Sequence, residues 1–244
     1  MRLEDQVTRV ASLNAEFSDQ STLAMIEALV CDQILGPMAV VTSFGAESAV
    51  LLHLIARANP AAPVIFIDTG FHFAETIAYR DELTDRLGLT CLETVQVDPI
   101  TRKRHDPRER LHLTDPDACC ALRKVEVLDR ALKPFTAWCT GQKRYQSQTR
   151  QRIDPFEVDL VRRKFKVNPL ADWSSQAIRD YAAQHDLPSH PLVDRGFSSI
   201  GCSPCTDPIQ QGEAPRAGRW RGQEKTECGL HAASSVFFRE GKVA

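Results

Sequence analysis

Two pairs of cysteines are the residues of this sequence whose types and spacing point most directly to chemistry. Cys119 and Cys120 are adjacent, and Cys202 and Cys205 are separated by two residues. A Cys-x-x-Cys turn can direct both thiolates to one metal ion or cluster, and a second pair completes four ligands. Zinc sites typically have about two to four residues between paired cysteines, so the adjacent pair favours an iron-sulfur cluster. A structural zinc site, a redox-active Cys202–Cys205 disulfide and unrelated buried thiols remain alternatives.

Another cysteine, Cys228, has different neighbours. It lies in Lys225-Thr-Glu-Cys-Gly-Leu-His231, near the end of the sequence. Nearby positive groups lower the pKa of a thiol and so favour the nucleophilic thiolate, whereas Glu227 has the opposite effect. The local sequence fits a nucleophile and an incidental surface cysteine equally well. The remaining cysteines lie within helix or strand patterns, where we expect small core residues without a function: Cys31, Cys91 and Cys139.

Two apolar runs of the sequence end in small polar turns. The first run ends at Ser43, Phe44 and Gly45, and the second at Asp68, Thr69 and Gly70. Backbone amides in such turns can surround an anion, and Asp68 can accept a hydrogen bond from a ribose hydroxyl or an adenine amine. Each turn alone could be an ordinary capped turn, but two in succession favour a nucleotide pocket. No Gly-Lys-Ser/Thr follows, which argues against a P-loop that hydrolyses ATP.

Basic residues offer further anion contacts at two places. Lys143 and Arg144 directly follow a predicted strand end at Thr140, and Arg216 and Arg219 lie between the second cysteine pair and Cys228. Folding of this C-terminal segment over the pocket brings the two arginines to an anion. We expect the basic runs 102–110 and 162–166 to be solvated surface.

The elements that position these residues follow from hydrophobic periodicity. Helical spacing covers 1–35, 47–58, 73–87 and 120–132, and apolar strand patterns cover 38–42, 63–68, 92–97 and 135–140. Near-continuous apolar strands that alternate with helices indicate an α/β fold with an open, doubly wound, mostly parallel sheet over roughly residues 20–185.

The sequence beyond residue 186 has a different composition. Prolines and glycines replace the periodic apolar positions there, which predicts irregular loops and a mobile terminus. We therefore expect a nucleotide-binding and cluster-bearing domain over 1–200 and a C-terminal segment with the second cysteine pair and Cys228 over 201–244.

Composition excludes several classes of protein. The 244 residues are 43% hydrophobic and 25% charged, which is typical of a globular chain and not of a disordered or fibrous one. A net charge of -2 gives no overall field to attract nucleic acid or an anionic membrane. We find no signal peptide or membrane-length apolar run, and expect a cytoplasmic protein without nucleic-acid or membrane partners. The sequence leaves a homo-oligomer open.

Taken together, the motifs resemble one family, the assimilatory adenylyl-sulfate reductases of the phosphoadenylyl-sulfate and adenylyl-sulfate reductase family. After the two polar turns, residues 40–231 carry four segments of this pattern: Cys119-Cys-Ala-Leu-Arg-Lys124, Cys202-Ser-Pro-Cys-Thr206, Arg216-Ala-Gly-Arg-Trp220 and Glu227-Cys-Gly-Leu-His231. The resemblance implies an adenine-nucleotide α-hydrolase-like fold and reduction of adenosine 5'-phosphosulfate to sulfite and AMP in sulfate assimilation. It also implies a thioredoxin or glutaredoxin-like reductant.

The resemblance also implies roles for individual residues. Cys119, Cys120, Cys202 and Cys205 would hold a [4Fe-4S] cluster, and Cys228 would attack the substrate sulfur and become an S-sulfocysteine. The implied substrate-binding residues come from the two turns and from the cationic positions: Ser43, Phe44, Gly45, Asp68, Thr69, Gly70, Lys124, Lys143, Arg144, Arg216, Arg219 and His231.

The sequence departs from the family pattern at several positions. The strand-end motif reads Lys143-Arg-Tyr-Gln-Ser147 where the family usually has Arg-Arg-Asp-Gln-Ser, so a point charge replaces a bidentate guanidinium. Asp207 stands at a frequent arginine position, Arg221-Gly222 replaces tryptophans, and Ala74 replaces a proline. These departures concern anion contacts and not the reaction class.

Two other functions stay open from the sequence. A 3'-phosphoadenylyl-sulfate reductase shares the fold and the C-terminal motif but normally lacks both cysteine pairs. A zinc-stabilised module that binds nucleotides or RNA leaves Cys228 and the C-terminal arginines unexplained.

Overall fold

A mostly parallel sheet forms the centre of the computed structural model, which describes residues 1–230. Within these residues the sheet has six strands in the order β3-β2-β1-β4-β6-β5, and only β5 runs antiparallel to its neighbour, β6. The strands are β1 Met38–Thr42, β2 Val64–Ile67, β3 Leu92–Val95, β4 Ala137–Cys139, β5 Phe156–Asp159 and β6 Lys164–Val167. This arrangement confirms the predicted α/β class with an open, mostly parallel sheet.

Both faces of the sheet are buried, because alternate residues of each central strand pack on opposite sides. In β1, Val40 belongs to the larger core cluster and Ala39 to the smaller one. In β2, Phe66 and Ile65 divide in the same way. The central strands therefore read as continuous apolar runs in the sequence.

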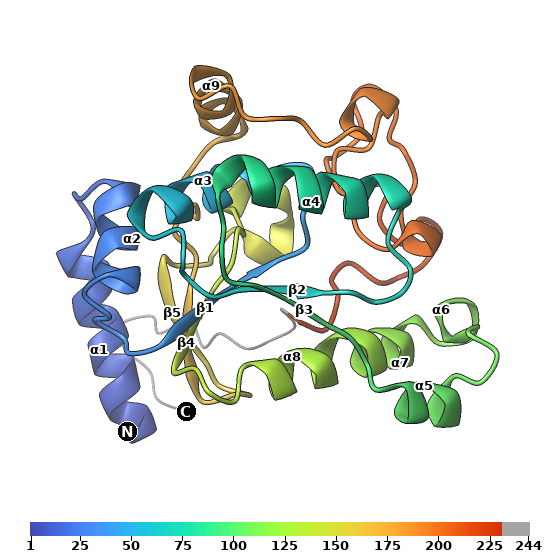
Figure 1. Cartoon of the computed structure of the whole chain (residues 1–244), viewed down its shortest axis with the longest axis horizontal. Coiled ribbons are helices and arrows are strands. Elements are labelled where there is room, and N and C mark those ends of the chain that lie inside the picture. The colour runs from blue at the N-terminus through green and yellow to red at the C-terminus, as the bar shows by residue number, and fades with distance from the viewer. Residues whose placement is uncertain (231–244) are drawn as a thin grey trace.

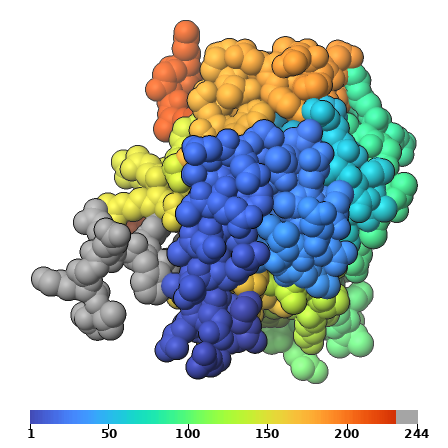
Figure 2. Space-filling view, turned by 90° about the vertical axis from the view of Figure 1, so that its left-hand side faces the viewer, coloured from blue at the N-terminus to red at the C-terminus, as the bar shows by residue number. Residues whose placement is uncertain are grey.

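Helices cover the two faces of this sheet (Figure 1). One layer, with α3 and α4 directly over the sheet, consists of α1 Leu3–Glu16, α2 Thr22–Val30, α3 Ser48–Ala58, α4 Ala74–Leu87 and α9 Ser175–Gln184. The other layer consists of α5 Pro99–His105, α6 Leu111–Thr114, α7 Pro116–Cys120 and α8 Glu126–Ala131. Figure 2 shows α1 and α2 side by side on one flank of the molecule.

A π-helical turn, η1 Ala121–Val125, joins α7 to α8. The sequence predicts a single helix over 120–132, and the structure corrects this to three consecutive helical segments. A π turn inserts one residue into the helical repeat and changes the direction of the side chains after it. Cys119 and Cys120 end α7, so the turn sets the directions of Arg123 and Lys124 relative to these thiols.

The hairpin of β5 and β6 is absent from the sequence predictions. Its residues include the basic run 162–166, which we expected to be solvated. That expectation is wrong for Lys166, which is 2% exposed and whose Nζ lies 2.9 Å from Glu157 Oε2 on the neighbouring strand. Charged and apolar residues alternate in β6, which in the sequence is typical of an exposed basic run and not of a strand with paired, buried charges.

Two further sequence expectations need correction. Cys31 and Cys91 are exposed and are not core residues, although Cys139 is fully buried in β4. Cys31 lies just after α2, and Cys91 directly precedes β3 at the edge of the sheet.

The segment after α9 is irregular, as predicted. From residue 185 to residue 230 its described helical elements are two short turns, η4 Val193–Arg195 and η5 Ser203–Cys205. A β-bridge between His72 and Cys202 and a hydrogen bond from Ser203 N to Phe71 O (2.7 Å) hold it against the turn after β2. The predicted mobile terminus beyond residue 230 lies outside the described residues. No helix within residues 1–230 is long and apolar enough to cross a membrane.

Candidate active site

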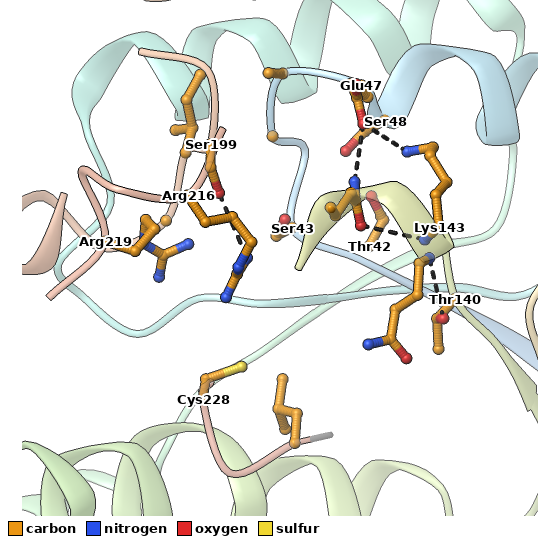
Figure 3. A pocket seen from close by; sticks show the side chains of 18 of the residues that line it. Thr42, Ser43, Glu47, Ser48, Thr140, Lys143, Ser199, Arg216, Arg219 and Cys228 are labelled. Carbon is orange, nitrogen blue, oxygen red and sulfur yellow. Dashed lines mark hydrogen bonds and ion pairs between the residues drawn. The ribbon is translucent and has the colours of Figure 1, made fainter. Parts of the chain in front are cut away.

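An open cavity lies at the carboxyl ends of β1 and β4, where an open α/β sheet usually binds its ligands. Its walls come from the strand-end turns, from the π turn and from the C-terminal segment (Figure 3). The predicted site residues that line it are Ser43, Gly45, Lys124, Lys143, Arg216, Arg219 and Cys228. The fold thus brings together residues that are far apart in the sequence.

Cys228 lies at this cavity and is half-buried. Figure 3 shows its sulfur on the cavity side, below the guanidinium groups of Arg216 and Arg219. A thiol in this place can reach a ligand whose anionic part is held by the arginines.

The two C-terminal arginines present positive charge to the cavity. The guanidinium of Arg219 stacks on Trp220 at 4.4 Å from the ring centroid, and its Nε donates to Cys205 O (3.3 Å). Arg216 Nη2 donates to Thr226 O (3.1 Å). Burial lowers the pKa of Arg216 to about 10, so the side chain keeps its charge at neutral pH.

Lys143 is buried and bound by a carboxylate that the sequence analysis did not single out. Its Nζ lies 2.8 Å from Glu47 Oε2, and Gln146 Nε2 donates to the same oxygen (2.8 Å). Tyr145 donates its hydroxyl to the other oxygen of Glu47. Burial raises the pKa of Glu47, but the charge of Lys143 and these hydrogen bonds outweigh it, so the pKa is below its ordinary value. The ion pair fixes the floor of the cavity where β1 and β4 end.

The four paired cysteines meet at a second, smaller cavity beside the first. Cys119 and Cys120 reach it from the end of α7, and Cys202 and Cys205 from η5. Lys124 borders both cavities. Thr69 Oγ1 lies 3.2 Å from Cys202 Sγ, which links the turn after β2 to the cysteines.

The electrostatics of this second cavity suit a bound cation or cluster. Burial and the neighbouring Cys120 raise the pKa of Cys119 to about 12. Burial also raises the pKa of Cys202, but Lys124 and the hydrogen bond with Thr69 reverse the effect and leave it below its ordinary value. Four thiolates packed together require a positive centre, since their charges oppose one another.

Unpartnered donors at the cysteine cavity are a further observation that fits a cluster. Within residues 1–230, Arg123 Nε and Trp220 Nε1 are buried without a hydrogen-bond partner, and both side chains line this cavity. Such groups are costly unless an acceptor is present, and the sulfur atoms of an iron-sulfur cluster are acceptors. In residues 1–230 no group of three or more histidine, cysteine or acidic side chains is arranged around a single metal-ion position. Four cysteines are the donor set both of structural zinc sites and of iron-sulfur clusters.

Several predicted site residues lie away from the open cavity. Phe44 is fully buried against Phe66, and Thr69 lines the cysteine cavity instead. Asp68 accepts hydrogen bonds from Gly70 N (2.9 Å) and Gln96 Nε2 (2.6 Å) and so closes its own turn. Arg144 points to Asp154 and Asp172. His231 lies outside the described residues.

Four charged residues of the two cavities or their walls were not predicted from the sequence: Glu47, Arg123, Arg150 and Glu227. Arg123 had a signal, since it stands inside the Cys-Cys-x-x-Arg-Lys motif. Its guanidinium is buried, and it bonds Asp106 Oδ2 and Thr69 O, both at 2.9 Å. Arg150 had no such signal in the sequence. It lies eleven residues after the end of β4, and only the conformation of the connecting loop brings it to the cavity.

Comparison with known proteins places this chain in a family. Residues 37–208 match the model of the phosphoadenosine phosphosulfate reductase domain. An adenosine 5'-phosphosulfate reductase of Mesorhizobium japonicum is 46% identical over 91% of this chain and 87% of its own length. A phosphoadenosine 5'-phosphosulfate reductase of Gloeobacter violaceus is 46% identical over 78% of this chain and 80% of its own length.

Solved structures support the fold. The phosphoadenylyl-sulfate reductase of Candida auris, in a phosphate complex, superposes with a TM-score of 0.69 at 24% identity over 83% of this chain and 96% of its own. With the family model and the relatives in agreement over most of its length, the chain belongs to the phosphoadenosine phosphosulfate reductase family.

Proposed function

We propose that this protein reduces adenosine 5'-phosphosulfate to sulfite and AMP, with Cys228 as the nucleophile. The observation that carries the proposal is the position of Cys228 in one cavity with three cationic side chains, Lys124, Arg216 and Arg219. A thiol surrounded by positive charge, next to strand ends that suit a nucleotide, fits attack on an anionic sulfuryl group. The name of the Mesorhizobium japonicum relative supports the same substrate.

The reaction proceeds in three displacements, one on the substrate sulfur and two that involve the reductant. The Cys228 thiolate forms a bond to the substrate sulfur, the bond from that sulfur to the bridging phosphate oxygen breaks, and AMP leaves with the electron pair. The product on the protein is an S-sulfocysteine. A dithiol protein of the thioredoxin or glutaredoxin type then attacks the Cys228 sulfur and releases sulfite, and its second thiol frees Cys228 and leaves a disulfide on the reductant.

The cationic residues stabilise the charges of the first displacement. Lys124, Arg216 and Arg219 offset the negative charge of the phosphosulfate and the charge that develops on the leaving phosphate. The turns at Ser43 and Gly45 offer backbone groups to the nucleotide from the end of β1. Lys143, bound to Glu47, keeps this end of the cavity in shape.

The cysteine cavity would hold a [4Fe-4S] cluster through Cys119, Cys120, Cys202 and Cys205. When bound, the cluster would supply a fixed charge and a rigid link between α7 and η5 next to Lys124. The lysine borders the cluster site on one side and the substrate cavity on the other. The name of the Gloeobacter violaceus relative makes the 3'-phosphorylated nucleotide the second candidate substrate.

Sulfite release tests this function. Anaerobically purified protein with thioredoxin is expected to form sulfite from adenosine 5'-phosphosulfate faster than from its 3'-phosphorylated form. Cys228→Ser is expected to lose sulfite release and keep nucleotide binding, while Cys91→Ser, a change at an exposed thiol outside the cavity, keeps both. Faster turnover of the 3'-phosphorylated substrate would overturn the substrate assignment, and turnover by Cys228→Ser would overturn the nucleophile.

A further inference from the structure

The residue directly before Cys228, Glu227, is held by Arg150 and Arg216, and of these two only Arg216 has a part in the reaction scheme. The Glu227 carboxylate accepts hydrogen bonds from Arg150 Nε (2.7 Å) and Arg150 Nη2 (2.9 Å), and from Arg216 Nη2 (3.1 Å). Thr149 Oγ1 (3.2 Å) and Ser147 Oγ (3.4 Å) add two weaker contacts. Arg150 thus binds the carboxylate through two hydrogen bonds, a bidentate geometry that fixes both the position and the orientation of the Glu227 side chain.

Arg150 is fixed to the body of the protein by contacts of its own. Arg150 closes the short turn η3 Gln148–Arg150, is 8% exposed, and donates through Nη1 to Gln146 Oε1 (2.6 Å). Gln146 in turn donates to Glu47, at the start of α3. A chain of side-chain contacts therefore connects Glu227 to the strand-end turn that forms the cavity floor.

The contacts of Glu227 are the polar side-chain attachment nearest to the nucleophile. Lys225, three residues before Cys228, makes a second attachment, to Asp117 and to Pro116 O (3.3 Å). In the described stretch 226–230, Glu227 is the only residue whose side chain makes hydrogen bonds or ion pairs. The side chains of Glu227 and Arg150 are each 10% exposed, so water screens their charges only weakly. The other attachments of this stretch are hydrogen bonds from Arg216 to Thr226 O and from Arg162 to Leu230 O, and the packing of Leu230 against the smaller core cluster.

We propose that Glu227 is a positioning residue, and that its ion pair with Arg150 docks the segment so that the Cys228 thiol stays at the cavity. This inference rests on the proposed function for its kinetic consequence and on the structure alone for the docking. A carboxylate one residue from the nucleophile orients it through the backbone without contact with the substrate. Breaking the pair releases the segment, which a modified Cys228 needs in order to meet a protein reductant.

Site-resolved alkylation tests the docking without turnover. The protein is treated with iodoacetamide, and labelling of each cysteine is followed by peptide mass spectrometry. Labelling is measured at a pH where the thiol is fully ionised, so that the lost negative charge does not itself raise the rate through the thiolate fraction. Glu227→Gln is then expected to accelerate labelling of Cys228 about tenfold or more, the scale of a lost charge-assisted hydrogen bond. Labelling of the exposed Cys31 and Cys91 should not change. Glu224→Gln is the matched control, because Glu224 is exposed and makes no hydrogen bond or ion pair within the described residues.

A second pair of variants checks that Arg150 is the partner. Arg150→Gln is expected to accelerate Cys228 labelling as Glu227→Gln does. The double variant should label no faster than either single one, because both remove the same interaction. Additive acceleration would show that the two side chains act independently and would overturn the proposal.

Steady-state kinetics separate positioning from substrate binding. Glu227→Gln is expected to lower kcat about tenfold or more with KM for adenosine 5'-phosphosulfate unchanged, and Glu227→Asp, which keeps the charge, should recover part of kcat. A lower KM with unchanged kcat would instead show a carboxylate that competes with the substrate anion. Wild-type labelling rates in Glu227→Gln would also overturn the proposal. If the wild-type protein forms no sulfite, the proposed function fails, while the labelling experiment still decides the docking.

Discussion

At the scale of single residues, two neighbours in the sequence can differ in whether their side chains face the cavity. Lys143 is buried at the cavity, whereas the adjacent Arg144 points away from it, with its side chain 37% exposed between Asp154 and Asp172. The sequence could predict that a basic pair follows β4, because the strand pattern was clear. It could not predict which residue faces the ligand, since the irregular backbone after the strand has no fixed side-chain period.

This contrast gives a paired mutational prediction. Arg219→Gln is expected to raise KM for adenosine 5'-phosphosulfate about tenfold to a hundredfold, because it removes a charge-assisted contact to the anion. Arg144→Gln should leave KM within about twofold, since its partners are two solvent-facing carboxylates. Initial-rate kinetics on the two variants check both values. An equal rise in KM for both would mean that the described direction of Arg144 is not the one used in the reaction.

At the scale of elements, the end of α7 and the turn η5 bring the cysteine pairs to one cavity, and the π turn η1 directly follows the first pair. The sequence could predict the four thiols as one set from their spacing and the family resemblance. It could not predict the π turn, because α7 and α8 have only five and six residues, too few to define a hydrophobic phase whose shift would reveal the extra residue. The turn matters because Arg123 and Lys124 lie within it and line the cysteine cavity.

Cluster content tests this arrangement. Anaerobically purified protein is expected to be brown and to contain about four iron and four acid-labile sulfide per chain. Cys202→Ser should lose most of the iron and the visible absorption, because it removes one of four ligands, and Cys91→Ser should keep both. Iron content that is unchanged in Cys202→Ser would refute the ligand assignment.

At the scale of the whole molecule, the parallel direction of the central strands could be predicted from the alternation of apolar strands and helices, whereas their order comes from the structure. The hairpin of β5 and β6 could not be predicted, because its buried Lys166 and Glu157 satisfy one another across strands and read in sequence as surface charges. The path of residues 187–230 could not be predicted either, because it too depends on contacts between distant segments. Contacts such as the one between His72 and Cys202 join distant segments without any periodic pattern.

One histidine joins this C-terminal path to the helical layer and gives a pH prediction. His190 is fully buried, with its Nε2 at 3.0 Å from Thr76 Oγ1 in α4 and its Nδ1 accepting from Leu192 N (3.1 Å). Burial lowers the pKa of His190 to about 4. Because the unfolded chain binds a proton at higher pH than the folded one, stability is full above the unfolded pKa of about 6.5 and falls between about pH 6.5 and 4.

The expected loss of unfolding free energy from this histidine is about 2 kcal/mol between pH 7 and pH 5. His190→Asn keeps an acceptor near the Nδ1 position and cannot take up a proton. Denaturant unfolding of the variant is therefore expected to show a smaller drop over this range than the wild type. Equal drops in the two proteins would contradict the neutral, buried state of His190.

The covalent intermediate on Cys228 is the central claim, and mass spectrometry tests it most directly. Protein is incubated anaerobically with adenosine 5'-phosphosulfate and without a thiol reductant, then digested and analysed peptide by peptide. The account predicts that one SO₃ unit appears on the peptide containing Cys228, with release of AMP, and that reduced thioredoxin removes it as sulfite. An unmodified Cys228 in a sample that has released AMP, or an SO₃ unit on a different cysteine, would contradict it.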